Sequence, residues 1–249
     1  MFQSPLFTDL SEKELAVKIC EQKRSLTLFH DHSVLSATAM SNKKLCYLVV
    51  GSIERRYILS MEIENLITAK SREELRIWLQ ENSKTEKSCW VLVSMTPNTD
   101  TLLYLDAVEE SLCFGWIDGV KKKISETGLA QRLSPRSKKS SWTELNKERV
   151  RRLEKLGLMC DEGRKVLPDM GHDSFKIDSV IEQRLKEKKQ VYDNFLTFPA
   201  LYQRIRIDTI QSNKNEPEIF NTRLDKFIIN TNENKMYGQW HDNGRLLDY

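Results

Sequence analysis

The chain has 249 residues, enough for one large domain or two small ones. Apolar residues make up 39% and charged residues 30%, and apolar side chains occur along the whole length, which excludes a disordered chain and predicts a helix-rich globular protein. The net charge of +3 is too small to indicate nucleic-acid binding by itself, and the longest apolar run, 45–50, is too short to span a membrane.

The five cysteines are widely separated, with no CxxC pair and no zinc-ligand spacing. This pattern is typical of reduced, mostly buried thiols, and it predicts neither a metal site nor a cofactor. Cys113, beside a helix end, is the one candidate for a reactive thiol. The N-terminus lacks a basic start followed by an apolar core, so we expect no secretory signal and a cytoplasmic location.

Residues 1–60 are interpreted as an N-terminal extension. Ser11 is expected to start a helix, and 45–51 and 55–60 have the composition of two strands about a Gly-Ser turn. His30 and His32 occupy a loop between them. Without further histidines or cysteines at a matching spacing, this loop is expected to be solvated rather than to bind a metal.

A domain of α+β type is predicted over 61–172. Ser71 and Glu74 form a capping box at the start of one helix, and 89–95 is the strongest strand pattern in the chain. Asp100 is expected to cap the next helix, and Gly115 to end it in a left-handed conformation.

A β-hairpin is predicted over 116–136, with a turn at 126–128. Alternation in its first strand places four residues on one face: Trp116, Asp118, Val120 and Lys122. In its second strand, the same alternation places Arg132, Ser134 and Arg136 on one face. Ser141, with Glu144, is then expected to cap a helix that ends at Gly157. Asn146 and Arg149 fall at the edge of its apolar stripe, where side chains can point into a cleft.

A C-terminal unit over 173–235 shows helical periodicity and no strand pattern. We expect three helices, with Pro199 and Pro217 at helix starts. The remaining residues, 236–249, lack periodicity and either fray or dock through Trp240. The predicted fold is therefore α+β: a helix-rich domain with a small antiparallel sheet, followed by an all-α unit.

The segment 121–139 is the most basic part of the chain, with seven Lys or Arg residues against Glu126. Three interpretations are open. In the first, each residue has an ordinary structural role. In the second, paired arginines, hydroxyls and a helix start form a pocket for a small phosphate-bearing anion. In the third, the lysines bind a nucleic-acid backbone. We favour the anion pocket. Its candidate ligand-binding residues are Trp116, Asp118, Arg132, Ser134, Arg136, Ser141, Trp142, Asn146 and Arg149. No catalytic nucleophile accompanies them, and whether a reaction is catalysed stays open.

Several long motifs resemble the YdeI/OmpD-associated family. They are SREELRIWL from Ser71, LCFGWIDG over 112–119, QRLSPRSKKSSWTELNKERVRRLEKLGLM over 131–159, and Thr222-Arg223 near the end of the helical unit. The resemblance covers roughly 67–231 and leaves 1–60 outside. It implies a bacterial stress or bacteriocin-protection protein with no defined reaction. The family name also implies a partner linked to an envelope porin.

Overall fold

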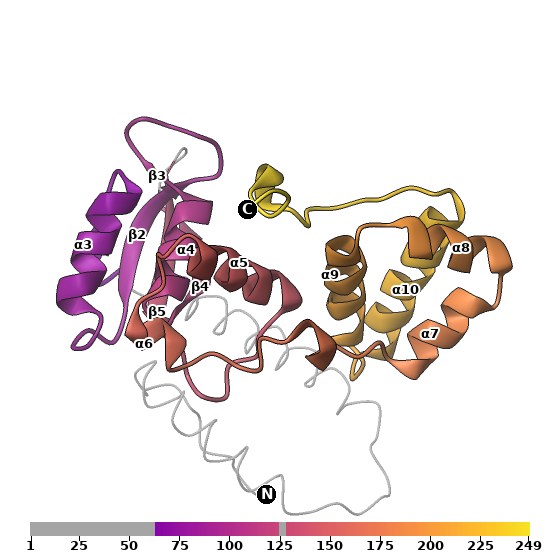
Figure 1. Cartoon of the computed structure of the whole chain (residues 1–249). Helices are drawn as coiled ribbons and strands as arrows, with labels where there is room; N and C mark the ends of the chain where they lie inside the picture. Colours follow the sequence, from indigo (N-terminus) through magenta and orange to yellow (C-terminus); the bar gives the residue numbers. More distant parts are fainter. Residues whose placement is uncertain (1–62, 125–127) are drawn as a thin grey trace, which may run out of the picture. The chain divides into compact units, whose positions relative to one another are not determined.

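The computed structural model of the chain describes residues 63–124 and 128–249 (Figure 1). The predicted helix from Ser11, the two predicted strands before residue 61 and the histidine loop lie outside the described residues, as do residues 126 and 127 of the turn predicted at 126–128. The α+β class is confirmed, because a small sheet with its helices is followed by a run of helices. The domain boundaries stay predictions.

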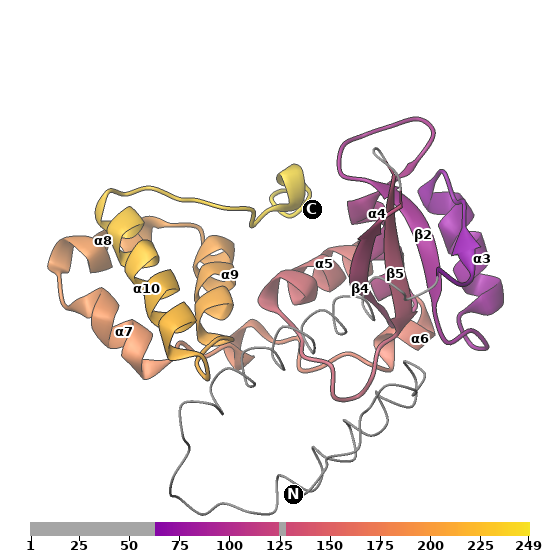
Figure 2. The same ribbon diagram turned by 180° about the vertical axis from the view of Figure 1, so that it is seen from behind.

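The sheet is mixed rather than antiparallel. Its strands are β1 (Leu66–Ile67), β2 (Cys89–Ser94), β3 (Leu102–Leu103), β4 (Trp116–Lys123) and β5 (Leu129–Pro135). The order is β1-β2-β5-β4, with β3 also on β2. Figure 2 shows β5 between β2 and β4. The pairs β2–β5 and β4–β5 are antiparallel, as predicted, whereas β1 and β3 run parallel to β2. Two-residue strands carry no alternation pattern, so the sequence could not reveal them.

Helices α3 (Arg72–Asn82), α4 (Tyr104–Cys113) and α5 (Glu144–Lys155) share one hydrophobic core with this sheet. The predicted cap of α3 is confirmed, because Ser71 Oγ accepts a hydrogen bond from Glu74 N–H at 3.3 Å. The predicted cap of α4 by Asp100 is wrong. The pairing of Leu102 with Val93 holds the chain extended, and the helix begins only at Tyr104, without a side-chain cap.

The hairpin is confirmed, but a β-bulge shifts its register between Asp118 and Lys121. Gln131 fills the irregularity, since its Nε2 donates to the carbonyl oxygens of Gly119 at 2.9 Å and Val120 at 3.4 Å. The predicted alternation fails beyond this point. Lys121, rather than Val120, turns towards Tyr104, with its Nζ 3.6 Å from the centre of the Tyr104 ring.

The start of α5 also differs from the prediction. Thr143, not Ser141, is the N-cap, and its Oγ1 accepts from Asn146 N–H at 3.2 Å. Gly157 ends the helix with φ +70°, as predicted. The short helix α6 (Asp161–Arg164) follows.

The helical unit contains four α-helices instead of three: α7 (Ser179–Lys186), α8 (Lys189–Thr197), α9 (Ala200–Gln211) and α10 (Pro217–Asn232). The first predicted helix is broken after Lys186. These helices enclose a second core built around Tyr202 and Phe227. Trp240 packs against this core, so the residues after α10 are docked.

Candidate functional site

Arg136 is a buried arginine directly after β5. Its backbone N–H donates to Gly115 O at 2.9 Å, which fixes the strand end to the turn after α4. The side chain is 6% exposed, and its Cζ lies 3.8 Å from the centre of the Trp142 ring. Nη1 donates to Ser141 O at 2.8 Å. Arg136 and Trp142, two of the predicted site residues, therefore stack on each other, while Ser141 accepts through its backbone carbonyl.

Two donors of Arg136 lack a partner. Nε and Nη2 are buried, and neither makes a hydrogen bond within the part of the chain that the structure describes. Burial lowers the pKa of this guanidinium, and the negative charge of Asp118 opposes that shift. A buried cation with unpaired donors is costly, because unmet donors lose their water without compensation. The arrangement leaves Arg136 with the capacity to bind an anion.

Asp118 lies next to Tyr104 on the neighbouring helix. The Tyr104 hydroxyl donates to Asp118 Oδ2 at 2.7 Å. Burial, followed by the charge of Asp118, raises the pKa of Tyr104. Tyr104 therefore stays protonated at neutral pH and keeps its hydrogen bond to the carboxylate. This bond restrains Asp118 near Arg136 without neutralising its charge.

Arg149 is also buried, yet each of its polar groups has a partner. Its Nε and Nη2 donate to both carboxylate oxygens of Asp242, at 2.6 and 2.9 Å. Nη1 donates to Asn146 Oδ1 at 2.8 Å. The predicted residues Asn146 and Arg149 thus meet each other, and the positive charge is already balanced by Asp242 from the C-terminal residues.

The start of α5 is likewise occupied by a carboxylate of the chain itself. Glu144 N–H donates to Asp208 Oδ2 of α9 at 3.0 Å. Burial raises the pKa of Asp208, and the hydrogen bond from Glu144 acts in the opposite direction. The helix N-terminus, which we expected to bind the ligand, instead joins α5 to α9.

The side chains of the remaining predicted site residues are not hydrogen-bond or ring partners of Arg136 in the described part of the chain. Trp116 is 1% exposed and belongs to the core, where its ring meets that of Trp78 edge-on at 6.0 Å. Arg132 and Ser134 are half-buried on β5, and no contact recorded among residues 63–124 and 128–249 joins either of them to Arg136. Among the predicted residues, the structure thus joins Arg136 to Trp142 and Ser141, and Arg149 to Asn146. Their role in binding a ligand stays a prediction.

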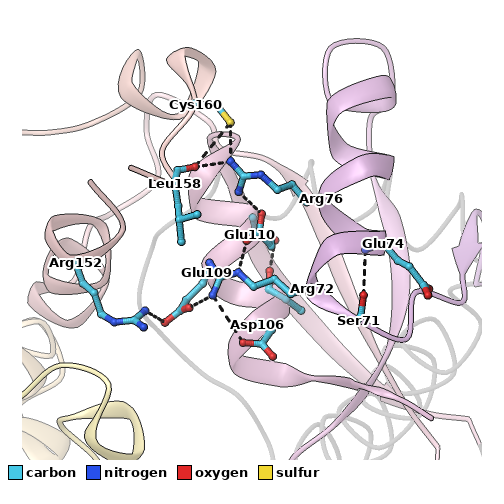
Figure 3. Close-up of polar contacts among 12 residues, drawn as sticks. Ser71, Arg72, Glu74, Arg76, Asp106, Glu109, Glu110, Arg152, Leu158 and Cys160 are labelled. Carbon is cyan, nitrogen blue, oxygen red and sulfur yellow. Dashed lines mark hydrogen bonds and ion pairs between the residues drawn. The ribbon is translucent and has the colours of Figure 1, made fainter. Parts of the chain in front are cut away.

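A buried pair of glutamates was missed by the sequence analysis (Figure 3). Glu109 and Glu110 of α4 are both fully buried. Arg72 Nη1 lies 2.6 Å from Glu109, and Arg72 Nε lies 2.5 Å from Glu110. Further ion pairs come from Arg76, Arg152 and Arg245. The one signal in the sequence was the spacing of Arg72 and Arg76, which puts both on the same face of α3.

Cys89 and Cys113 are buried in the first core, and Cys160 is half-buried beside it. Burial raises the pKa of Cys113 to about 12, and that of Cys89 to about 12 as well. A thiol of such high pKa is almost wholly protonated at neutral pH and is a poor nucleophile. Within residues 63–124 and 128–249, no cluster of His, Cys, Asp or Glu could hold a metal ion, and no helix is long and apolar enough to cross a membrane.

Residues 67–166 match a family model described as a domain of unknown function (DUF8412). The match runs from β1 to just past α6, so it contains Arg136, Arg149 and the buried glutamate pair. It leaves out the helical unit and the residues that supply Asp242. No curated protein and no solved structure matches the chain.

Proposed function

We propose that the protein binds a small anion carrying a phosphate group, with Arg136 as the anchoring residue. The observation that carries the proposal is the pair of buried, unpaired donors on Arg136. A phosphate group offers several strong acceptor oxygens and suits the planar guanidinium fork. The charge of the ligand would also offset the cost of burying this cation.

Trp142 has two roles in this proposal. Its ring supports one face of the guanidinium and so fixes the plane in which Arg136 offers its donors. It is only half-buried, and the neighbouring residues Ser137, Lys138 and Lys139 are exposed. The ligand reaches Arg136 by a shift of this exposed loop, and an aromatic ring in the ligand, such as a nucleobase, has Trp142 to stack on.

The test is isothermal titration of the full chain with inorganic phosphate and with a panel of nucleotides and sugar phosphates. We expect Arg136→Met to abolish binding, and Arg136→Lys to weaken it about tenfold because a point charge replaces the fork. Because Arg136→Met removes an unpaired buried charge, its free energy of unfolding should fall by no more than about 1 kcal/mol, or rise. The control is Lys188→Ala with Lys189→Ala, which removes two exposed charges from the helical unit and should leave the affinity unchanged.

If no member of the panel binds, or if Arg136→Met binds as tightly as the wild type, the proposal is wrong. Binding of duplex DNA that depends on Lys138 and Lys139, and not on Arg136, would favour the alternative of a nucleic-acid backbone surface. Such binding would weaken steeply with salt.

The biological setting is proposed from the sequence resemblance alone. A bacterial stress or bacteriocin-protection role, with a partner linked to an envelope porin, follows from the resemblance of 67–231 to the YdeI/OmpD-associated family. The motifs at 112–119 and 131–159 support it. Co-purification of the endogenous protein with envelope fractions would test the adaptor version of this role.

A further inference from the structure

Helices α9 and α10 lie side by side in the helical unit, and contacts between them gather several polar side chains at their junction (Figure 1). Arg206 and Thr209 are one turn apart on α9. Arg223 and Lys226 are likewise one turn apart on α10. Nη1 of Arg223 donates to Thr209 O at 2.8 Å, and this hydrogen bond joins the two helices at one end of the junction.

The Tyr237 ring joins the helices at the other end of the junction. Arg206 Cζ lies 5.4 Å from the centre of this ring, and Lys226 Nζ lies 5.1 Å from the same centre. The backbone holds Tyr237 in place, because its N–H donates to the Tyr202 hydroxyl at 3.2 Å. Two cations from different helices therefore share one ring, and Arg223 lies one turn from Lys226.

These three cations lack carboxylate partners. No ion pair among the described residues, 63–124 and 128–249, involves Arg206, Arg223 or Lys226, whereas Arg184 on α7 pairs with both Glu187 and Asp225. Nε of Arg206 is also buried without a hydrogen bond in that part of the chain. Like charges held close together are unfavourable, and contacts with an aromatic ring offset only part of the cost. The cluster therefore points to an anionic partner.

Exposed isoleucines flank the cations on α10. Ile219 is one turn before Arg223 and is 39% exposed, and Ile229 is one turn after Lys226 and is 59% exposed. Spacings of three and four residues place these side chains along the same side of the helix. A nucleic-acid backbone offers no apolar surface to the isoleucines, whereas a protein segment can present both carboxylates and apolar groups. The mixed surface favours a protein partner.

We propose that this surface of α9 and α10 docks an acidic segment of a partner protein, in which apolar side chains alternate with carboxylates at helical spacing. The carboxylates of the partner pair with Arg206, Arg223 and Lys226, and its apolar side chains cover the two isoleucines. Arginine and tyrosine are enriched at protein interfaces, and this surface contains both. The inference goes beyond the proposed function, because the surface contains no residue of the Arg136 site.

Fluorescence anisotropy with a labelled peptide tests the docking surface on the full chain. The probe is a peptide of about 20 residues made of glutamate, leucine and alanine, with the leucines along one side of a helix. We expect Arg223→Glu with Lys226→Glu to weaken its binding by at least about tenfold. The matched control, Lys188→Glu with Lys189→Glu, changes the net charge equally at two exposed positions of the helical unit and should leave the affinity unchanged.

Two further measurements separate docking from a loss of folding and from simple charge attraction. A second peptide with lysine in place of every glutamate should bind the variant with Arg223→Glu and Lys226→Glu more tightly than it binds the wild type, which an unfolded variant could not achieve selectively. Ile229→Ala keeps all charges and removes exposed apolar surface. It should weaken binding of the acidic peptide about fivefold.

Several outcomes would overturn the docking surface. One is no binding of the acidic peptide by the wild type, and another is an equal loss of affinity in the control with Lys188→Glu and Lys189→Glu. Binding that is unaffected by Ile229→Ala would leave only non-specific attraction between charges. If the wild type binds single-stranded polyuridine but not the peptide, and Arg223→Glu with Lys226→Glu abolishes that binding, the surface belongs to a nucleic acid and the proposal is wrong.

Discussion

At the scale of single residues, Arg136 and Arg149 show what residue type alone can and cannot reveal. Both were predicted to bind an anion, and both are buried arginines close to Asp118. Their difference lies in their partners, since Arg149 is fully paired and Arg136 is not. The partner of Arg149 is 93 positions away in the sequence, and no local pattern could identify it.

The same limit explains why the buried glutamates were missed. Glu109 and Glu110 fall in a helix whose apolar residues define its buried face, and two adjacent acids next to such a stripe are usually solvated. Their burial depends on arginines from three other segments: Arg72 and Arg76 on α3, Arg152 on α5, and Arg245 near the C-terminus.

Glu109→Gln should be strongly destabilising. Glu109 lies within 3.2 Å of Arg72, Arg152 and Arg245, and its loss leaves these partly buried cations with reduced counter-charge. We expect the free energy of unfolding in urea to fall by about 3 kcal/mol. Glu81→Gln, at an exposed position of α3, is the control and should leave the unfolding midpoint in place. Equal midpoints for the two variants would contradict a structural role for the network.

At the scale of elements, the sequence predicted what local chemistry determines. The helix α3, the strand β2, the hairpin and the turns at Gly115 and Gly157 were all found from caps, alternation and glycines. The errors occurred where tertiary contacts override a local preference. Asp100 does not cap the helix, because Leu102 pairs with β2 and keeps the chain extended. The predicted alternation of side chains fails in β4, because a bulge lies beside Gln131.

A comparison of Gly115 with Gly157 measures how much stability a side chain costs where the backbone of another helix lies close. Both follow a helix and have nearly the same φ, +72° and +70°. A Cβ at Gly157 would meet nothing within 4 Å, whereas a Cβ at Gly115 would lie 2.9 Å from Glu162 O.

Both substitutions to alanine should therefore be unfavourable, by unequal amounts. We expect Gly157→Ala to lower the free energy of unfolding by about 1 kcal/mol, the cost of the left-handed conformation. Gly115→Ala should cost about 1–3 kcal/mol more, because α6 must also move. Thermal unfolding of both variants gives the difference directly, and equal losses would show that the approach of α6 relaxes without cost.

At the scale of the whole molecule, α5 holds the described parts together. Its residues contact the first core through Val150 and Leu153, and the second through Leu145. Glu148 is its most connected acid, with hydrogen bonds from Arg151, Arg204 and the Tyr249 hydroxyl. The α+β class was predictable from the element pattern, but these connections were not, because they join residues far apart in the sequence.

The acid sensitivity of the protein should depend partly on Glu148. Burial alone would raise its pKa, but the Tyr249 hydroxyl and the two arginines bring the pKa below its ordinary value of 4.5. A lowered pKa in the folded state means that the ionised form stabilises the fold above about pH 4.5, and that this stability is lost as the pH falls further. Glu148→Gln should therefore lose less stability than the wild type between about pH 5 and pH 3.

Urea unfolding at a series of pH values measures this slope. Glu154→Gln removes an exposed acid from the same helix and should retain the slope of the wild type. A Glu148→Gln variant as acid-sensitive as the wild type would show that the carboxylate of Glu148 is not stabilised by its partners.

The Arg149–Asp242 pair has a consequence for the order of events during synthesis. Arg149 is made 93 residues before Asp242, which at ordinary translation rates is an interval of roughly 5–20 s. Throughout that interval the α5 arginine exists without its internal partner. The pair can therefore form only after the carboxylates of α4 and α5, among them Glu109 and Glu148, are already present.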